Sequence, residues 1–327
     1  MSENKGVLIF AEQNDGEIHP VTYELINKGK MLADQLKTEL YTVILGGPDL
    51  EVDELIYRGS DKVFYLINEE FNSPNPVLYK DYLKKYIEEK INPEIILIGA
   101  TLFGRSLAPR LAISLKSGLT ADCTDLEIDS SDNKLIQIRP AFSENILAHI
   151  KTTSFLQMAT VRYQEFETAE RDLSRTGEII KEDIKVQKDN SLNIIDQLAS
   201  KDVDITNAEV IVAGGKGLKN PEDFSLLRKL AEILGGELGA SRDVVDEDYI
   251  SKSHQVGYSG NRVKPVIYIA CGISGAPQHL AGMKESDTII AINIDPSAPI
   301  FNYCDYGIVG DLYDIIPKWI KKIEEDN

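Results

Sequence analysis

Residues 267–293 constrain the fold of this chain more than any other stretch. An apolar run at residues 266–270 leads into a loop of small residues, 272–275, and Pro277 follows at once. Proline suits the first turn of a helix, where its missing N–H costs nothing. A second apolar run follows at residues 288–294. A strand, a glycine loop and a helix in this order typically place backbone N–H groups against a phosphate, so the sequence predicts an α/β domain with an anion site.

The first half of the chain shows the same alternation of short apolar runs and amphipathic segments. Apolar residues in the amphipathic segments recur every three or four positions, which indicates helices with one buried face. Short strands separated by such helices predict βαβ units and a parallel sheet covered on both sides. We expect strands at residues 7–11, 41–45, 62–66 and 95–99, and helix faces formed by Val21, Leu25, Leu32 and Leu36 and by Leu78, Tyr82 and Tyr86.

The middle of the chain changes character after an expected helix that carries Arg105 and Arg110. Gly118 suits the end of that helix. The apolar runs beyond residue 134 are short and joined by tight connections, which favours antiparallel pairing. We expect strands at residues 121–126, 135–139, 146–150 and 157–161, the last three antiparallel.

Residues 165–206 are rich in charge and show no sustained helical or strand period, so we interpret them as a linker. The α/β rhythm restarts with an expected strand at residues 209–213 and the glycine-rich loop 214–217. A helix is expected to begin at Asn220 and to end at Gly235, which are favoured capping residues. The chain is therefore predicted to be an α/β protein of two domains, residues 1–200 and 201–327.

Composition excludes several classes of function. The 327 residues carry a net charge of −18, which argues against nucleic acid or an anionic membrane surface as partner. The three cysteines, Cys123, Cys271 and Cys304, are far apart, so zinc, iron–sulfur and disulfide frameworks are not expected. No apolar run approaches the length of a membrane span, and the amino terminus shows no leader sequence. We expect a cytoplasmic protein.

Several small motifs in the second domain are candidates for binding. Lys216 lies within the glycine loop 214–217, where it adds a positive charge to a phosphate-type turn; the alternative is a tight turn that needs glycine. Arg242 follows a run of small residues and suits an anion contact, or is an ordinary surface arginine. His279 is the only one of the four histidines next to a phosphate-type loop.

In their order along the chain, the segments GGKGL, GASR, QVGYSG, residues 272–293 and DPSAPIFNYCDYGIVGDL resemble the FAD-binding domain of electron transfer flavoprotein alpha subunits. The first half, with VLIFAEQ and GRSLAPRLAISLKSGLTADCTDL, is similar to the amino-terminal domain of that family. The resemblance implies a nucleotide-hydrolase-like parallel-sheet domain followed by a Rossmann-like FAD-binding domain. The implied FAD contacts are Lys216, Ser241, Arg242, Gln255, Val256, Gly257, Tyr258, Ser259, Ser274, Gly275, Ala276, Pro277, Gln278, His279, Asn293, Asp311 and Leu312.

The resemblance also implies roles for these positions. Arg242 would lie over the isoalloxazine, Ser259 would bond its N5 edge, and His279 would lie near the N1–C2=O edge. Residues 274–279 would wrap the pyrophosphate, while Asn293 and residues 311–312 would bind the adenosine half. Two departures from the family pattern are Lys216, where arginine is common, and Ser259, where threonine is frequent.

Partners and function are implied in the same way. The resemblance implies an electron-transfer subunit that relays single electrons, forms a heterodimer with a beta subunit, and docks to an acyl-CoA dehydrogenase or a related flavoenzyme. In some members a second FAD allows electron bifurcation from NADH, whereas in others AMP takes that place. No general acid–base pair is evident in the second domain, so substrate chemistry by this chain alone is not expected.

Three other interpretations compete with this one. Residues 272–276 are similar to a hydrolase nucleophile elbow, although GISGA departs from the GxSxG spacing. The glycine loops would also suit an NAD-dependent dehydrogenase, but the GxGxxG fingerprint and its later acid are missing. The third alternative is an interaction protein without a cofactor.

Overall fold

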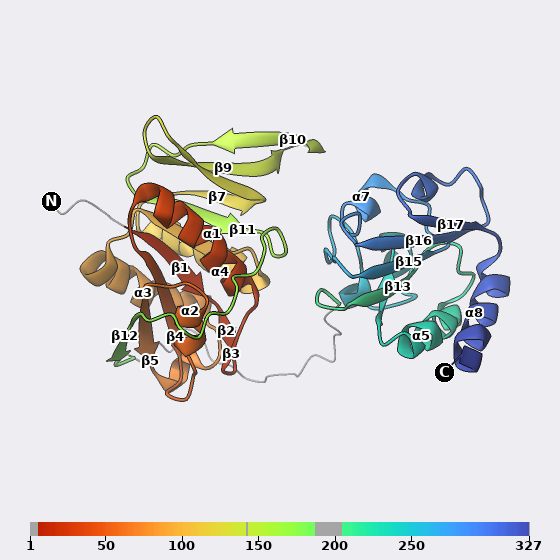
Figure 1. Cartoon of the computed structure of the whole chain (residues 1–327), viewed down its shortest axis with the longest axis horizontal. Helices are drawn as coiled ribbons and strands as arrows, with labels where there is room; N and C mark the ends of the chain where they lie inside the picture. Colours follow the sequence, from red (N-terminus) through yellow and green to blue (C-terminus); the bar gives the residue numbers. More distant parts are fainter. Residues whose placement is uncertain (1–5, 142, 187–204, 327) are drawn as a thin grey trace. The chain divides into compact units, whose positions relative to one another are not determined.

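The computed structural model describes residues 6–141, 143–186 and 205–326. The chain divides into two compact units, Met1–Ile194 and Ile195–Asn327 (Figure 1). The predicted domain boundary, between residues 200 and 201, lies outside the described residues. Each unit is built on its own largely buried parallel sheet, as the alternation of strands and helices predicts.

Unit 1 contains a seven-stranded sheet in the order β12-β5-β4-β1-β6-β11-β7, with every pair between neighbouring strands parallel. A three-stranded antiparallel sheet, β10-β9-β8, and the short hairpin β2-β3 accompany it. The strands are β1 Val7–Ala11, β2 Gln13–Asn14, β3 Glu17–Ile18, β4 Leu40–Gly46, β5 Lys62–Ile67, β6 Ile95–Gly99, β7 Gly118–Cys123, β8 Asp125–Asp129, β9 Lys134–Ala141, β10 Ser143–Ile150, β11 Gln157–Val161 and β12 Glu178–Asp183; the helices are α1 Val21–Leu36, α2 Asp53–Tyr57, α3 Pro76–Tyr86 and α4 Leu102–Ser114.

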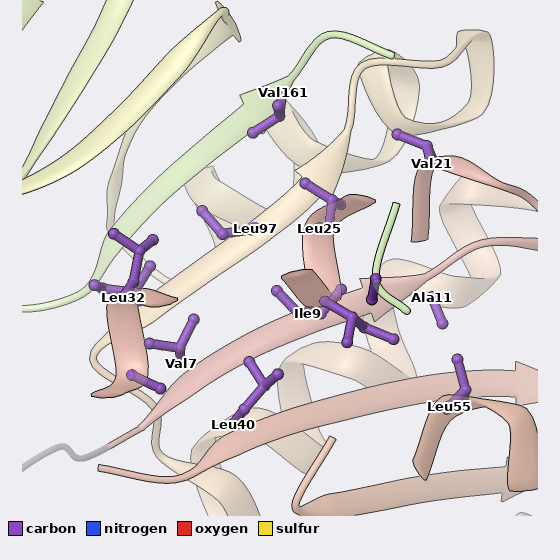
Figure 2. Packing of buried hydrophobic residues seen from close by; sticks show 14 of the residues in the cluster. Val7, Ile9, Ala11, Val21, Leu25, Leu32, Leu40, Leu55, Leu97 and Val161 are labelled. Atoms are coloured by element: carbon purple, nitrogen blue, oxygen red, sulfur yellow. The ribbon is translucent and has the colours of Figure 1, made fainter. Parts of the chain in front are cut away.

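The two faces of this sheet are buried in separate apolar clusters. Alternate residues of β1 point to opposite faces, so Val7 and Ile9 pack in the cluster with α1, whereas Leu8 and Phe10 pack in the cluster with α3 and α4. Figure 2 shows Leu25 of α1 above Ile9 of β1. The predicted face of α1 is confirmed at Val21, Leu25 and Leu32, which are fully buried, and at Leu36, which is partly buried.

Four sequence predictions in unit 1 are wrong. Residues 157–161 form a parallel strand between β6 and β7 rather than an antiparallel one, and all five are buried because both faces of the sheet are covered. Gly118 begins β7 instead of ending α4, whose C-cap is Leu115. Residues 121–126 are split between β7 and β8 at Thr124, after Asp122 adopts a positive φ of 59°. Part of the expected linker, β12, pairs with β5 along its whole length.

The buried face of α3 is also shifted from the prediction. Tyr79, Leu83 and Tyr86 are buried, while Leu78 and Tyr82 only pack against the edge of the cluster. The Tyr79 hydroxyl lies 2.6 Å from the carbonyl oxygen of Phe71 and accepts a bond from the Gln13 amide at 3.0 Å. Tyrosine can enter the core here because its polar end is satisfied.

Unit 2 contains a five-stranded parallel sheet in the order β14-β13-β15-β16-β17. Helices α5 and α8 cover one face, while α7 and the segment before β15 cover the other. The predicted strands in this unit are confirmed to within one residue at each end. The strands are β13 Val210–Gly214, β14 Glu237–Ala240, β15 Ile267–Cys271, β16 Thr288–Asn293 and β17 Tyr306–Val309; the helices are α5 Phe224–Ile233, α6 Arg242–Asp246, α7 Pro277–Leu280 and α8 Leu312–Asp326.

The predicted start of the helix after β13 is also confirmed. Asn220 forms a capping box with Asp223, and a 3₁₀ turn, Pro221–Asp223, leads into α5. Gly235 has a positive φ of 67° just beyond the end of the helix. Among the described residues, no helix is long and apolar enough to cross a membrane.

Glu24 gives unit 1 a testable dependence on pH. Its carboxylate, on α1, is 3% exposed and accepts bonds from the backbone N–H groups of Gln164 at 3.1 Å and Phe166 at 3.4 Å. Burial raises the pKa of Glu24 to about 7, against the lowering effect of these bonds. The folded state therefore holds a proton that the unfolded chain releases above its ordinary pKa, so stability falls as pH rises from about 4.5 to about 7.

We predict that Glu24→Gln flattens this fall, which is worth at most about 3 kcal/mol. The measurement is urea unfolding of the full chain at pH 5, 6, 7 and 8. Glu17→Gln, at an exposed position on β3, is the matched control and should leave the slope unchanged. An equal pH slope for wild type and Glu24→Gln would contradict the assignment.

Candidate functional site

The carboxyl ends of the five strands of unit 2 meet at one edge of the sheet. Because the sheet is parallel, the segments that follow β13, β14, β15, β16 and β17 all begin there. The chain runs from β13 to β14 on one side and later adds β15 on the other, so the order reverses at β13. Such a reversal is where α/β sheets bind ligands.

All the predicted contact residues are associated with this edge. Lys216 follows β13, Ser241 and Arg242 follow β14, and residues 274–279 follow β15. Asn293 ends β16, and residues 311–312 follow β17. The segment 255–259 is joined to the end of β14 by a bridge between Ala240 and Gln255. The structure therefore brings together segments that are up to about a hundred positions apart in the sequence.

The loops after β13 and β15 pack against each other through their backbones. The N–H of Gly215 donates to the Cys271 carbonyl at 3.0 Å, and the N–H of Gly217 donates to the Gly272 carbonyl at 2.9 Å. A Cβ on Gly217 would lie 2.6 Å from the Gly272 Cα. Glycine is therefore needed in this loop for the close approach of two backbones, in agreement with the tight-turn interpretation.

The loop after β15 is fastened from below by β16 and the segment that follows it. The Asn293 amide donates to the Ile273 carbonyl at 2.9 Å, and Ile300 N–H donates to the Ser274 carbonyl at 3.0 Å. Gly275 has a positive φ of 89°, and a side chain there would collide with the backbone of Ile300. The loop is thus held in one conformation.

Three consecutive N–H groups of this fixed loop are left without a partner. Within the described part of the chain, the N–H groups of Ser274, Gly275 and Ala276 donate no hydrogen bond. Ser274 and Ala276 are exposed, so these donors lie at the surface of the edge. Successive free backbone N–H groups form a concave site for an anion. The predicted helix after the loop is only the single turn α7, so the loop itself supplies most of these donors.

His279 lies at the end of this segment with one ring nitrogen free. The ring is 6% exposed, and its Nε2 lies 3.0 Å from the hydroxyl oxygen of Tyr268. Nδ1 is buried and forms no hydrogen bond with a described residue. Burial lowers the pKa of His279 to about 4, while the Val256 backbone and Asp243 act in the opposite direction. The imidazole is therefore neutral near pH 7.

The segment 255–259 lies over α7. Val256 N–H donates to the Ala240 carbonyl at 2.9 Å, and Tyr258 N–H donates to the Gln278 carbonyl at 2.7 Å. Gln255 is buried and donates through its amide to the Ser259 hydroxyl at 3.1 Å. The predicted N5 contact, Ser259, is thus joined to another predicted contact, Gln255.

Two predicted cations lie at the edge, and each has an acidic partner from the α6 region. Lys216 forms an ion pair with Glu247, and Nε of Arg242 lies 3.0 Å from a carboxylate oxygen of Asp246. Both cationic side chains are more than half exposed, at 53% and 65%. Exposed pairs of this kind are weak, so an anionic ligand can compete for either cation.

The remaining predicted contacts support the loops from below. Ser241 is the N-cap of α6, and its N–H donates to the Gly214 carbonyl at 2.9 Å. Asp311 accepts a bond from Tyr313 N–H at 2.9 Å at the start of α8. Leu312 is buried, and one of its methyl groups would lie 3.0 Å from a Cβ on Gly272. In the structure these residues act on the chain itself.

These features fit FAD. The free N–H groups of residues 274–276 suit a pyrophosphate, the two exposed cations add positive charge, and the free Nδ1 of His279 suits a polar ring edge. In the ranges that the structure describes, no three acidic, histidine or cysteine side chains are grouped to hold a metal ion. Sequence reasoning missed Tyr268, Asp246 and Glu247. Tyr268 alternates with apolar residues as a core residue does, and the two acids look like ordinary surface charge.

The geometry also bears on the hydrolase alternative. The nucleophile in such an enzyme must lie within hydrogen-bond reach of its base. Ser274 and His279 form no hydrogen bond with each other, and the Nε2 of His279 is already bonded to Tyr268. The structure therefore gives the nucleophile-elbow interpretation no support.

Comparison with known proteins agrees with the geometry. Residues 7–186 match the family model described as electron transfer flavoprotein domain, and residues 204–284 match the electron transfer flavoprotein FAD-binding domain. The chain is 43% identical to the electron transfer flavoprotein subunit alpha of Thermoanaerobacterium thermosaccharolyticum, over 99% of each chain. It is 40% identical to the protein FixB of Clostridium saccharobutylicum, over 99% of this chain and 98% of the relative.

A third relative has a more specific name. It is the lactate dehydrogenase (NAD(+),ferredoxin) subunit LctC of Acetobacterium woodii, 41% identical over 98% of this chain and 77% of the relative. The matches cover both units and include the loops described above up to residue 284. The chain therefore belongs to the electron transfer flavoprotein alpha-subunit family, with unit 2 as its FAD-binding domain.

Proposed function

We propose that this chain binds FAD at the carboxyl edge of the unit 2 sheet and relays single electrons between a partner dehydrogenase and an acceptor. Membership of the family establishes electron transfer and the FAD-binding domain. The observation that carries the location is the row of three unpartnered N–H groups at Ser274, Gly275 and Ala276. Fixed donors need no reorganisation to receive a phosphate, which favours tight binding.

The proposal assigns a role to each group at the edge. The N–H groups of residues 274–276 hold the pyrophosphate, with Pro277 and Gln278 beside them and Lys216 adding a point charge. Asn293 and residues 311–312 face the adenosine half. Arg242 and the segment 255–259 lie toward the flavin ring, with Ser259 at the N5 edge and Ser241 beside the cofactor. Bound FAD supplies the chemistry, because it accepts and returns electrons one at a time.

Charge near the ring would come from Arg242 rather than from His279. The buried imidazole of His279 is neutral near pH 7, so its role is that of a hydrogen-bonding group at the N1–C2=O edge. Arg242 keeps its charge at any physiological pH. A positive charge beside a flavin makes reduction easier, because the added electron is attracted to it.

Subunits of this family pair with a beta subunit and serve dehydrogenases. We propose, more narrowly, that an acyl-CoA dehydrogenase or a related flavoenzyme is the donor and that the complex works in the cytoplasm. The similarity over nearly the whole length of the alpha-subunit relatives supports a heterodimer of the same kind. The three free cysteines, far apart in the chain, suit a reducing compartment.

A second candidate function is electron bifurcation from NADH with a second FAD in the complex. Its support is the 41% identity to a subunit whose name includes both NAD(+) and ferredoxin. Bifurcation divides an electron pair between two acceptors, so it needs a second redox group, whereas a simple relay needs only one. The two candidates therefore differ in the flavin content of the complex.

We predict that Lys216→Ala weakens FAD binding by roughly 2- to 5-fold, the effect of about 0.5–1 kcal/mol for an exposed charge pair. The loss should shrink at high salt because exposed charges are screened. The measurement is quenching of FAD fluorescence by the heterodimer stripped of flavin. Lys229→Ala is the matched control, because Lys229 is equally exposed and pairs with Glu324 on α8. Equal affinities for the two variants would contradict the role of Lys216.

The flavin content of the complex from its native source distinguishes the two functions. One FAD per heterodimer is the result expected for a single-electron relay. Two FAD molecules per heterodimer would favour bifurcation, with the FAD of unit 2 as the relay. A complex without flavin would contradict both, and acid extraction followed by chromatography gives the count directly.

A further inference from the structure

We propose that Tyr268 is a positioning residue that holds His279 with its proton on Nδ1, so that His279 presents a hydrogen-bond donor at the FAD site. The inference deepens the proposed function and rests on it for the identity of the acceptor. Its structural basis is the buried pair of side chains formed by β15 and α7.

Tyr268 has one polar partner within the described part of the chain. The residue is fully buried in β15, and its hydroxyl oxygen lies 3.0 Å from Nε2 of His279. The ring centroids are 6.1 Å apart and the planes are tilted by 60°. The hydroxyl is therefore held in the plane of recognition of one histidine nitrogen rather than shared among several groups.

The direction of this hydrogen bond follows from what each group can satisfy. If Nε2 donated to the hydroxyl, the hydroxyl proton of Tyr268 would be buried with no acceptor. A buried donor left unsatisfied costs about 1–3 kcal/mol. If the hydroxyl donates instead, Nε2 accepts, and the one proton of a neutral imidazole must be on Nδ1.

The surroundings keep both groups neutral. Burial raises the pKa of Tyr268 well above its ordinary value, so its hydroxyl stays protonated. Burial lowers the pKa of His279 to about 4. Of the neighbouring ionisable groups, Cys271 is buried with its pKa raised to about 12, and Asp243 favours the charged ring only weakly against burial.

The donor that results is left for a ligand. Nδ1 of His279 is buried and has no hydrogen-bond partner among the described residues, although the Val256 backbone lies near enough to affect its pKa. A buried N–H without an acceptor is unfavourable in the free protein. A carbonyl oxygen at the edge of a flavin ring would satisfy it, whereas a ring N–H would not.

The state of His279 can be measured without FAD. We predict that ¹⁵N NMR of the full chain, labelled at histidine, shows a protonated Nδ1 and an unprotonated Nε2 for His279 at pH 7. Tyr268→Phe, which removes only the hydroxyl, should shift the ring toward the Nε2–H form. His279→Gln assigns the signals. His254, whose Nδ1 lies 2.8 Å from the Leu238 carbonyl oxygen, is an internal control that should not change.

FAD affinity provides the second readout. Tyr268→Phe should weaken FAD binding by about 3- to 10-fold, the effect of one hydrogen bond. In a His279→Ala background, the same substitution should have no further effect on FAD affinity. A purely structural role for Tyr268 would instead weaken binding equally in both backgrounds.

The outcomes separate the inference from the proposed function. An Nε2–H form in the wild type, or the same tautomer in wild type and Tyr268→Phe, would overturn the inference even if FAD binds. Absence of FAD binding by the wild type would contradict the proposed function, while the tautomer would still decide the inference. If Tyr268→Phe does not fold, the wild-type tautomer alone decides it.

Discussion

The site depends on the close approach of two backbones, the glycine loops after β13 and β15. Gly215 and Gly217 donate to the carbonyls of Cys271 and Gly272, so the two loops form one connected surface at the point where the strand order reverses. Side chains at these glycines would separate the loops. Because the loop after β15 is also fastened by Asn293 and Ile300, its free N–H groups keep a fixed direction. The anion site is therefore a property of the backbone.

Unit 1 has a similar reversal of strand order but fills it with its own side chains. The order reverses at β1, between β4 and β6, where Glu12 and Thr101 follow β1 and β6. The Thr101 hydroxyl donates to Glu12 at 2.6 Å and accepts from Gly104 N–H at 2.9 Å, which caps α4. A carboxylate at this position repels phosphate, and the capped helix end has one donor fewer to offer. The two sheets thus differ at the equivalent point in the way that places FAD in unit 2.

Much of the fold could be predicted from local patterns. The strands of both sheets are short apolar runs because both of their faces are covered, and a covered strand leaves a continuous apolar signal. The errors concern pairing and exposure. The short β11 could be paired either way until its neighbours are known, and β12 lies at the edge of the sheet with half-exposed residues that give little apolar signal. Pairing over long sequence separations leaves no local trace.

The site shows the same division. The loops, the glycines and His279 could be identified because glycine and proline impose local conformations that the sequence displays. The bonds that set the chemistry could not. The contact of Tyr268 with His279 depends on which face of β15 meets α7, and the pairing of Lys216 with Glu247 joins loops 31 positions apart. The neutral state of His279 follows from burial, which only the folded chain defines.

Amide hydrogen exchange of the heterodimer, with and without FAD, tests the central claim most directly. The account predicts that FAD slows exchange at Ser274, Gly275 and Ala276, whose N–H groups have no partner in the free chain. It predicts no change at Glu12 and Thr101, at the corresponding point of unit 1. Protection at that point, with unchanged exchange at residues 274–276, would contradict the account.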